Sequence, residues 1–284
     1  QPAVLVLDEA AAMLGPLGRR EVLEAMRRLN QDEGVTIVAI THLIDEAVHA
    51  DRIIVMAEGT IVLEGPPRTV FAQAETLRSL QLAVPQLTKI AQGLHEQWPD
   101  FPVDILTVEE MVAALKARLA TDEQRPIPQS PLSNLQSPVS APPSETQSPI
   151  PSLQSQPPLL STENLAHYYM RGTPLEVKAI ADIDLSVRPG EILGIIGHTG
   201  SGKSTVVQHF NGLLRAHEGK VTVFGQDLAD PKVNLLAIRR RVGLVFQFPE
   251  SQLFEQYVGD DVAYGPRTFK LSREEVRSRV RTAM

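Results

Sequence analysis

A glycine-rich stretch in the second half of the chain offers the most specific chemistry in this sequence. Residues 197–204 read Gly-His-Thr-Gly-Ser-Gly-Lys-Ser, which is a glycine, four further residues and then Gly-Lys-Ser. Glycines let the backbone curl until successive N–H groups point at phosphate oxygens, and a helix that starts at the end of the loop adds its positive dipole end. In this pattern Lys203 provides a positive charge for the outer phosphates, and the hydroxyl of Ser204 is a ligand for Mg²⁺. The loop predicts a nucleotide site; the alternative is a loop kept without its ligand.

Two acidic residues end a short apolar run near the start of the chain. Residues 3–9 read Ala-Val-Leu-Val-Leu-Asp-Glu, as expected for a buried strand with carboxylates at its carboxyl end. Ligands bind at that edge in open α/β sheets. In phosphate-loop enzymes an aspartate at this place holds Mg²⁺, so Asp8 is the candidate, and Glu9 could polarise an attacking water. The alternative is a solvated strand end, which the glycine loop disfavours.

His42 follows a second apolar run, residues 35–40. A lone histidine is usually structural. Here we expect a strand parallel to the one that ends at Asp8, so His42 would reach the same crevice and contact the γ-phosphate. We expect five other histidines, which lack such a context, at the surface: His49, His95, His167, His209 and His217.

These groups need a sheet to position them, and the apolar patterns supply its elements. In residues 1–124 we expect strands at 3–7 and 35–40, a hairpin of 52–56 with 60–63, and helices at 19–29, 45–49 and 107–120. In residues 161–284 we expect strands at 182–187 and 192–196, a helix at 203–214 and another from about 272. Strands with near-continuous apolar runs that alternate with helices favour an α/β fold with a parallel sheet covered on both faces.

A segment of unusual composition divides the chain. Residues 125–160 contain 10 Pro, 8 Ser and 5 Gln among 36 residues, and this composition predicts a disordered, extended linker. A proline-rich docking site is the alternative. The blocks on either side differ in charge, because residues 1–124 have a net charge of −9 and residues 161–284 of +2. The mildly basic second block suits a polyanionic ligand such as a nucleotide.

Composition excludes several classes of protein. The chain has 284 residues and a net charge of −7, which argues for about two domains and against a nucleic-acid binder. It has no cysteine, which excludes disulfides and thiolate chemistry and fits a reducing compartment. No apolar run approaches the roughly 20 residues of a spanning helix, so we expect any membrane association to be peripheral, through partner proteins.

Together the motifs resemble the ATP-binding cassette (ABC) family, and most of all the ATPase subunits of energy-coupling factor transporters of the cobalt and vitamin type. Residues 242–254, Val-Gly-Leu-Val-Phe-Gln-Phe-Pro-Glu-Ser-Gln-Leu-Phe, and 261–266, Asp-Val-Ala-Tyr-Gly-Pro, are similar to that subfamily's glutamine loop and the run after it. Residues 208–213, Gln-His-Phe-Asn-Gly-Leu, also match. Residues 50–65 look like the segment after the family's switch histidine, and residues 83–115 resemble the subfamily's C-terminal extension.

The resemblance implies a phosphate-loop NTPase (RecA-like) core with an ABC-type antiparallel β subdomain, and it assigns roles. Tyr169, with Tyr168 as the fallback, would stack on adenine. Gln247 would touch Mg²⁺ and the attacking water, Glu9 would be the general base and His42 the γ-phosphate sensor. Asp8 and Ser204 would complete the Mg²⁺ ligands. The residues that would wrap the ATP phosphates are Gly197, His198, Thr199, Gly200, Ser201, Gly202, Lys203, Ser204 and Thr205.

The order of the motifs departs from that of a cassette, because the acidic strand and the histidine precede the phosphate and glutamine loops. The Leu-Ser-Gly-Gly-Gln-like signature is missing, and both ends of the chain interrupt an element. We therefore expect the middle of a tandem fusion, with the C-terminal half of a first ATPase (1–124), a linker (125–160) and the N-terminal half of a second ATPase (161–284). Gly15 and Ala10-Ala11 replace the Asp and the Pro-Thr or Ala-Thr usual in the family, and we expect weaker communication across a dimer.

The resemblance implies an ATPase that powers uptake of a metal ion or a vitamin. Its partners would be a second cassette, a transmembrane coupling subunit and a substrate-binding membrane subunit, at the cytoplasmic face of the membrane. A fragment that binds ATP without hydrolysing it, or a regulatory remnant, is the alternative. A chromosome-maintenance or repair ATPase shares these loops, but the sequence lacks coiled-coil heptads and a DNA-scale basic patch.

Overall fold

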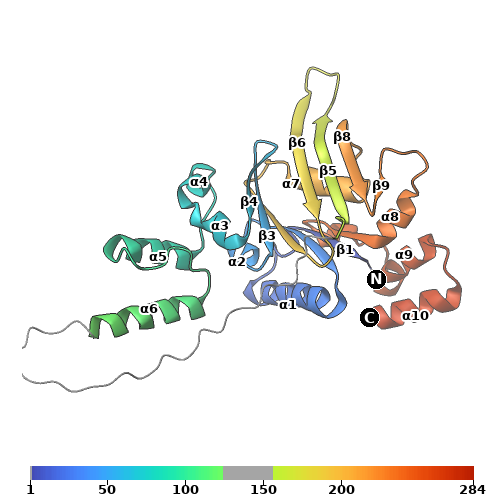
Figure 1. The fold of residues 1–284 in the computed structure, drawn as a ribbon. Helices are drawn as coiled ribbons and strands as arrows, with labels where there is room; N and C mark the ends of the chain where they lie inside the picture. The colour runs from blue at the N-terminus through green and yellow to red at the C-terminus, as the bar shows by residue number, and fades with distance from the viewer. Residues whose placement is uncertain (1, 124–155) are drawn as a thin grey trace, which may run out of the picture.

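Two stretches of chain, residues 2–123 (the first stretch) and 156–284 (the second stretch), build one sheet. The computed structural model describes residues 2–123 and 156–284 (Figure 1). Its six-stranded sheet has the order β10-β1-β2-β7-β3-β4. The first stretch provides β1 (Val4–Asp8), β2 (Thr36–Ile40), β3 (Arg52–Ala57) and β4 (Thr60–Gly65), and the second provides β7 (Ile192–Ile196) and β10 (Val242–Val245). Since β7 lies between β2 and β3, the second stretch supplies a central strand of the sheet.

The strand sequences explain this arrangement. Neighbouring strands are parallel except β3 and β4, which form the expected antiparallel hairpin. One face packs on α7 (Lys203–Phe210) and a second sheet, in a core that contains Val6, Ile195 and Phe210. On the other face, a core that includes Ile53 and Phe71 packs beneath the shorter helices. Apolar strands covered on both faces are what a parallel sheet requires.

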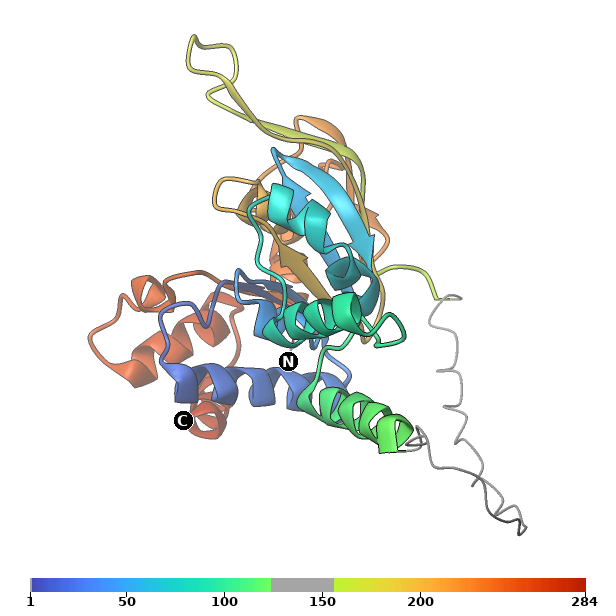
Figure 2. The ribbon, with the colours of Figure 1, turned by 90° about the vertical axis from the view of Figure 1, so that its left-hand side faces the viewer.

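The second sheet is antiparallel and consists of second-stretch strands alone. Its order is β6-β5-β8-β9, with β5 (Leu160–Tyr169), β6 (Val177–Val187), β8 (Glu218–Val223) and β9 (Gln226–Asp227). The long β5–β6 hairpin projects beyond the rest of the molecule (Figure 2). The α/β class and the combination of a largely parallel sheet with an antiparallel sheet are therefore confirmed.

The remaining helices surround these sheets. They are α1 (Pro16–Glu33), α2 (Ile44–Ala47), α3 (Pro67–Ala72), α4 (Ala74–Ser79), α5 (Gln86–Gln97), α6 (Val108–Glu123), α8 (Leu235–Arg241), α9 (Val258–Thr268) and α10 (Arg273–Ala283), with a 3₁₀ turn at Pro249–Gln252. Helices α5 and α6 extend to one side around a small core of their own, which contains Phe101 and Ile105 (Figure 1). Within residues 2–123 and 156–284, no helix is long and apolar enough to cross a membrane.

Several boundaries differ from expectation for local reasons. Helix α1 is longer than 19–29 because Pro16 starts it and Gly34, in the left-handed region at φ 67°, ends it. Helix α7 stops at Phe210 instead of 214, before the left-handed Gly212. Of the predicted linker, residues 125–155 lie outside the described residues, and Leu160 already belongs to β5.

Polar contacts also join the two stretches. The Arg52 guanidinium donates to a carboxylate oxygen of Glu191 at 2.6 Å. The Asn30 side chain donates to the Gly190 carbonyl at 2.8 Å, and the Gly190 N–H donates to the Thr36 hydroxyl at 2.8 Å. These bonds hold the turn before β7 against the first stretch.

Candidate nucleotide-binding site

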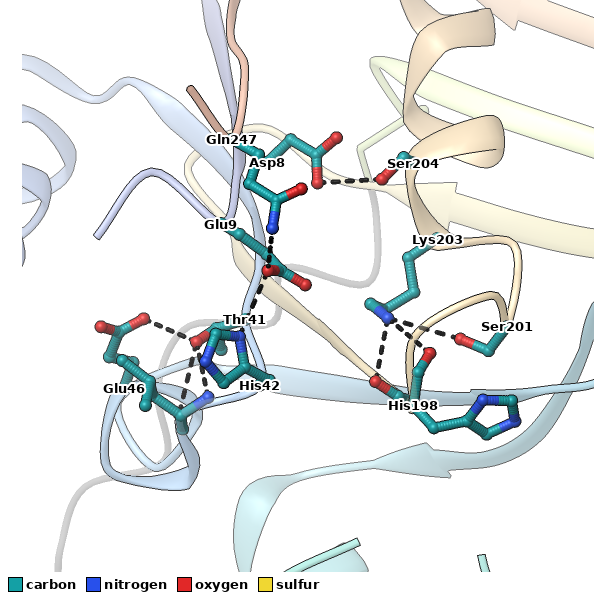
Figure 3. Close-up of polar contacts among 12 residues, drawn as sticks. Asp8, Glu9, Thr41, His42, Glu46, His198, Ser201, Lys203, Ser204 and Gln247 are labelled. Atoms are coloured by element: carbon teal, nitrogen blue, oxygen red, sulfur yellow. Dashed lines mark hydrogen bonds and ion pairs between the residues drawn. The ribbon is translucent and has the colours of Figure 1, made fainter. Parts of the chain in front are cut away.

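The carboxyl ends of three parallel strands bring the predicted site residues together. Strands β1, β2 and β7 are neighbours, and they end at Asp8, Ile40 and Ile196. Asp8 and Glu9, His42 and the glycine loop follow these ends and lie at one edge of the sheet (Figure 3). This edge is the usual ligand site of an open α/β sheet.

The glycine loop has the backbone that its sequence predicts. Gly200 and Gly202 have φ values of 83° and 95°, in the left-handed region that favours glycine. A Cβ at Gly202 would lie 2.5 Å from the Cγ2 of Ile180, so the position also lacks room for a side chain. Lys203 is buried, and its ammonium donates to the carbonyl oxygens of Gly197 and His198, both at 2.9 Å. Burial lowers the pKa of Lys203, while the charges of Glu9 and Asp8 oppose that shift.

Asp8 and Ser204 meet across the sheet edge. The Ser204 hydroxyl donates to an Asp8 carboxylate oxygen at 3.1 Å, although 196 residues separate the two. Burial raises the pKa of Asp8, and the hydrogen bond from Ser204 and the charge of Lys203 oppose the rise. A hydroxyl and one carboxylate are oxygen ligands of the kind Mg²⁺ uses when substrate phosphates and water supply the rest. In the part of the chain that the structure describes, no group of three or more His, Cys, Asp or Glu could hold a metal by itself.

Glu9 occupies an unusual backbone position. Its φ is 50°, a left-handed value that non-glycine residues rarely adopt, and its N–H donates to the Ile40 carbonyl at 3.0 Å. Because this left-handed turn directly follows the last residue of β1, the alternation of side chains between the two faces of the strand does not extend to Glu9. Such outliers gather at functional sites, where the surroundings hold them in place.

Side chains from two other segments contact one carboxylate oxygen of Glu9. The Gln247 amide donates to Oε2 of Glu9 at 2.9 Å, and Nδ1 of His42 lies 3.3 Å from the same oxygen (Figure 3). The Glu9 side chain is 15% exposed and that of His42 is 50% exposed, so this group opens to solvent. A carboxylate held by an amide and an imidazole at a phosphate loop is suited to accept a proton from water.

Thr41 and Glu46 support this group, and the sequence reasoning missed both. The buried Thr41 hydroxyl donates to Glu46 at 2.6 Å and accepts the Leu43 N–H at 2.9 Å. The contacts fix the turn that carries His42 out of β2 (Figure 3). A threonine that bonds the backbone two residues on is a recognised turn pattern, and it could have identified Thr41.

The turn between β3 and β4 also abuts the glycine loop. The Gly59 N–H donates to the Ser201 carbonyl at 3.2 Å, and the Gly59 carbonyl accepts the Ala181 N–H at 2.9 Å. A Cβ at Gly59 would lie 2.6 Å from the Ala179 carbonyl oxygen, so glycine allows this close approach. The first stretch thus contacts the phosphate loop directly.

The two adjacent tyrosines differ in their surroundings. The Tyr169 hydroxyl lies 3.2 Å from the Thr205 hydroxyl, and the residue is 41% exposed. The Tyr168 ring instead carries two cations, with Arg171 at 5.2 Å and Lys178 at 5.7 Å from its centre. Tyr169 is therefore the tyrosine beside the phosphate loop.

The expectation that five histidines lie at the surface was wrong for two of them. His167 is 5% exposed and His209 is fully buried, while His49, His95 and His217 are exposed. His167 lies on β5 and His209 on α7, and those elements pack against each other in the main core. Neutral imidazoles that bond to carbonyl groups can be buried there.

Comparison with known proteins adds family information. Residues 180–284 match the family described as ABC transporter. The energy-coupling factor transporter ATP-binding protein EcfA2 of Clostridium tetani is 49% identical over 125 residues, which are 44% of this chain and 43% of that protein. A putative ABC transporter ATP-binding protein of Caldanaerobacter subterraneus subsp. tengcongensis is 32% identical over 285 residues, which span all of this chain and 46% of that protein. The solved structure of cbiO1 from Clostridium perfringens, part of the ABC transporter complex cbiONQ, has 34% identity and a TM-score of 0.38 over 45% of this chain and 49% of that one. The chain spans less than half the length of these relatives.

Proposed function

We propose that the chain is part of an ABC transporter ATPase, as the match of residues 180–284 to that family supports, and that it binds ATP with Mg²⁺ where its two stretches meet. The observation that carries the proposal is the contact between Ser204 and Asp8, which joins the phosphate loop to the acidic strand end. Glu9, Gln247 and His42 adjoin it through a single carboxylate oxygen. Both stretches would thus contribute to the site.

Each predicted residue has a role that its position supports. Backbone N–H groups of residues 197–205 and the ammonium of Lys203 would bind phosphate oxygens, and Tyr169 would stack on the base. Ser204 and Asp8 would hold Mg²⁺, which neutralises phosphate charge when bound. Glu9 would accept a proton from water, and Gln247 and His42 would orient the Glu9 carboxylate. Gln247 contacts Glu9 here, so we place it with the water-activating group and propose its Mg²⁺ contact as an additional role.

We propose that the whole chain belongs to a longer ATPase of an energy-coupling-factor type importer. The support is the relative of more than twice this length that aligns with the whole chain in the same order. Residues 1–124 would be the C-terminal half of one cassette, 125–160 the linker and 161–284 the N-terminal half of the next. The assembly would pair two cassettes with a transmembrane coupling subunit and a substrate-binding membrane subunit, at the cytoplasmic face of the membrane, for uptake of a metal ion or vitamin.

A second candidate function is ATP binding without turnover. The sequence contains no Leu-Ser-Gly-Gly-Gln-like signature, and Gly15 stands where the family usually has Asp. A site without the signature from an opposite cassette lacks the closure that excludes water.

Nucleotide titration tests the proposal. We expect Lys203→Ala to weaken binding of a fluorescent ATP analogue by the whole chain more than about tenfold, because it removes the phosphate charge at the start of α7. The matched control is Lys232→Ala, which removes an exposed lysine from the same stretch. Unchanged affinity in the Lys203 variant would overturn the proposed site.

A further inference from the structure

Three histidine rings form a cluster beside the phosphate-loop helix, and the proposed function does not use them. The ring centre of His167 lies 5.0 Å from that of His209 and 4.4 Å from that of His217. The same ring meets Tyr169 edge-on, at 5.0 Å between centres and 71° between planes. His167 therefore lies at the middle of the cluster, in direct contact with the tyrosine that faces the phosphate loop.

Hydrogen bonds join this cluster to α7 and to the segment after it. Nδ1 of His209 donates to the Thr205 carbonyl at 2.7 Å, and Nδ1 of His167 donates to the Arg215 carbonyl at 3.2 Å, because carbonyl oxygens only accept. The Tyr169 hydroxyl then returns to the Thr205 side chain at 3.2 Å. Burial lowers the pKa of both donor histidines, that of His209 to about 4, so both rings are neutral at pH 7.

We infer that His167 and His209 are positioning residues that fix the Tyr169 ring relative to the phosphate loop, so that an adenine base can stack while α7 binds the phosphates. His167 and Tyr169 are two residues apart on β5, and their rings lie against each other. Edge-to-face packing sets the plane of an aromatic ring, which matters because Tyr169 is 41% exposed and its hydroxyl contact with Thr205 leaves the ring free to tilt. This inference rests on the proposed ATP site.

The test compares two ligands that share phosphates but not a base. Calorimetric titration of the whole chain with ATP and with inorganic tripolyphosphate, both with Mg²⁺, measures the two contributions. We expect His167→Ala to weaken ATP binding about tenfold, the scale of one base–aromatic stack, and to leave tripolyphosphate binding unchanged. His167→Phe retains a ring against Tyr169 and should restore ATP affinity.

Two further variants separate positioning from folding. His95→Ala is the matched control, because His95 also bonds a carbonyl through Nδ1, at 2.7 Å from Phe101, but lies in the α5–α6 unit. If His167→Ala loses cooperative thermal unfolding, His167→Asn decides, since it keeps a donor near Nδ1 while losing the ring. It should show the same loss, confined to ATP.

Three results would overturn the inference: equal loss of ATP and tripolyphosphate affinity, no loss of either, or no recovery in His167→Phe. Tyr169→Ala should match His167→Ala, and the double variant should lose no more than either single one. An unaltered chain that binds neither ligand would instead refute the proposed function, before any histidine variant is made.

Discussion

The ion pair between Arg52 and Glu191 should be a major determinant of how tightly the two stretches hold together. Arg52, on β3, bonds Glu191 at 2.6 Å and also reaches Glu64 and the Ser186 carbonyl. Its side chain is 16% exposed and that of Glu191 is 6% exposed, whereas Glu64 is 43% exposed. The second Glu191 oxygen accepts the Arg188 N–H at 2.8 Å, so the carboxylate is fixed at both oxygens.

Burial sets the expected magnitudes. Glu191→Gln keeps the shape but removes the charge from a buried hydrogen bond, and we expect it to lower the free energy of unfolding by about 2 kcal/mol. Glu191→Ala leaves Arg52 without its buried partner and should cost about 3–5 kcal/mol. Glu64→Gln is the matched control on the same guanidinium, and its exposure limits the cost to about 0–1 kcal/mol.

Urea unfolding followed by far-UV circular dichroism measures these differences as shifts in midpoint at constant slope. A double variant with Arg52→Met tests the pairing, because the cost of Glu191→Gln should shrink once the guanidinium is gone. Equal costs for Glu191→Gln and Glu64→Gln, or a cost that Arg52→Met does not change, would show that the buried ion pair does not hold the two stretches together.

Three further predictions concern other parts of the molecule. The pKa of His209 falls from 6.5 to about 4 on folding, because burial disfavours its charged form, so stability present above pH 6.5 should be lost as pH falls towards 4, by up to about 3 kcal/mol. Urea unfolding at a series of pH values measures this loss, and His167 and His217 are the titratable groups against this ring. If the dependence of the unfolding free energy on pH is unchanged in His209→Phe, the assignment to His209 is contradicted. Gly15→Asp should stabilise the chain by about 0.5 kcal/mol in the same assay, since α1 has no side-chain cap and no acid in its first turn; a loss would show that Gly15 is needed for its backbone. Steady-state phosphate release should be far slower than for an intact cassette pair at equal concentration, because the signature that closes the site is missing; a comparable rate would contradict this.

The sequence predicted those elements well whose pattern is local. The strands at Val4–Asp8 and Ile192–Ile196 are apolar throughout, and the glycine loop has a fixed spacing, so each follows from a short stretch of chain. The contact between Asp8 and Ser204 could also be anticipated. Asp8 ends β1 and the loop that carries Ser204 follows β7, and neither stretch alone has enough strands to cover the edges of these two apolar strands.

Other features depend on tertiary packing that periodicity does not encode. The burial of His209 arises because α7 lies between two sheets, and a histidine in an exposed helix would have the same local sequence. The approach of Gly59 to Ser201 depends on the register between the β3–β4 hairpin and the loop, which are far apart in the chain. Thr41 had a local signal, but its partner Glu46 becomes evident only once the turn after β2 is folded.

Cross-linking β1 to β10 tests whether both stretches form one sheet and one site. Leu5 and Gly243 are partners in that parallel pair, and a Cβ at Gly243 would lie 3.4 Å from the Leu5 side chain. The chain has no cysteine, so Leu5→Cys with Gly243→Cys introduces a single pair, which a short bifunctional thiol-alkylating reagent can bridge. A protease site inserted within residues 125–155 then allows the two stretches to be separated. On a denaturing gel we expect the two stretches to stay joined within one molecule after cleavage, whereas Leu5→Cys with the exposed Leu175→Cys should give separate fragments. Separation in both variants, or bridges only between molecules, would contradict one shared sheet.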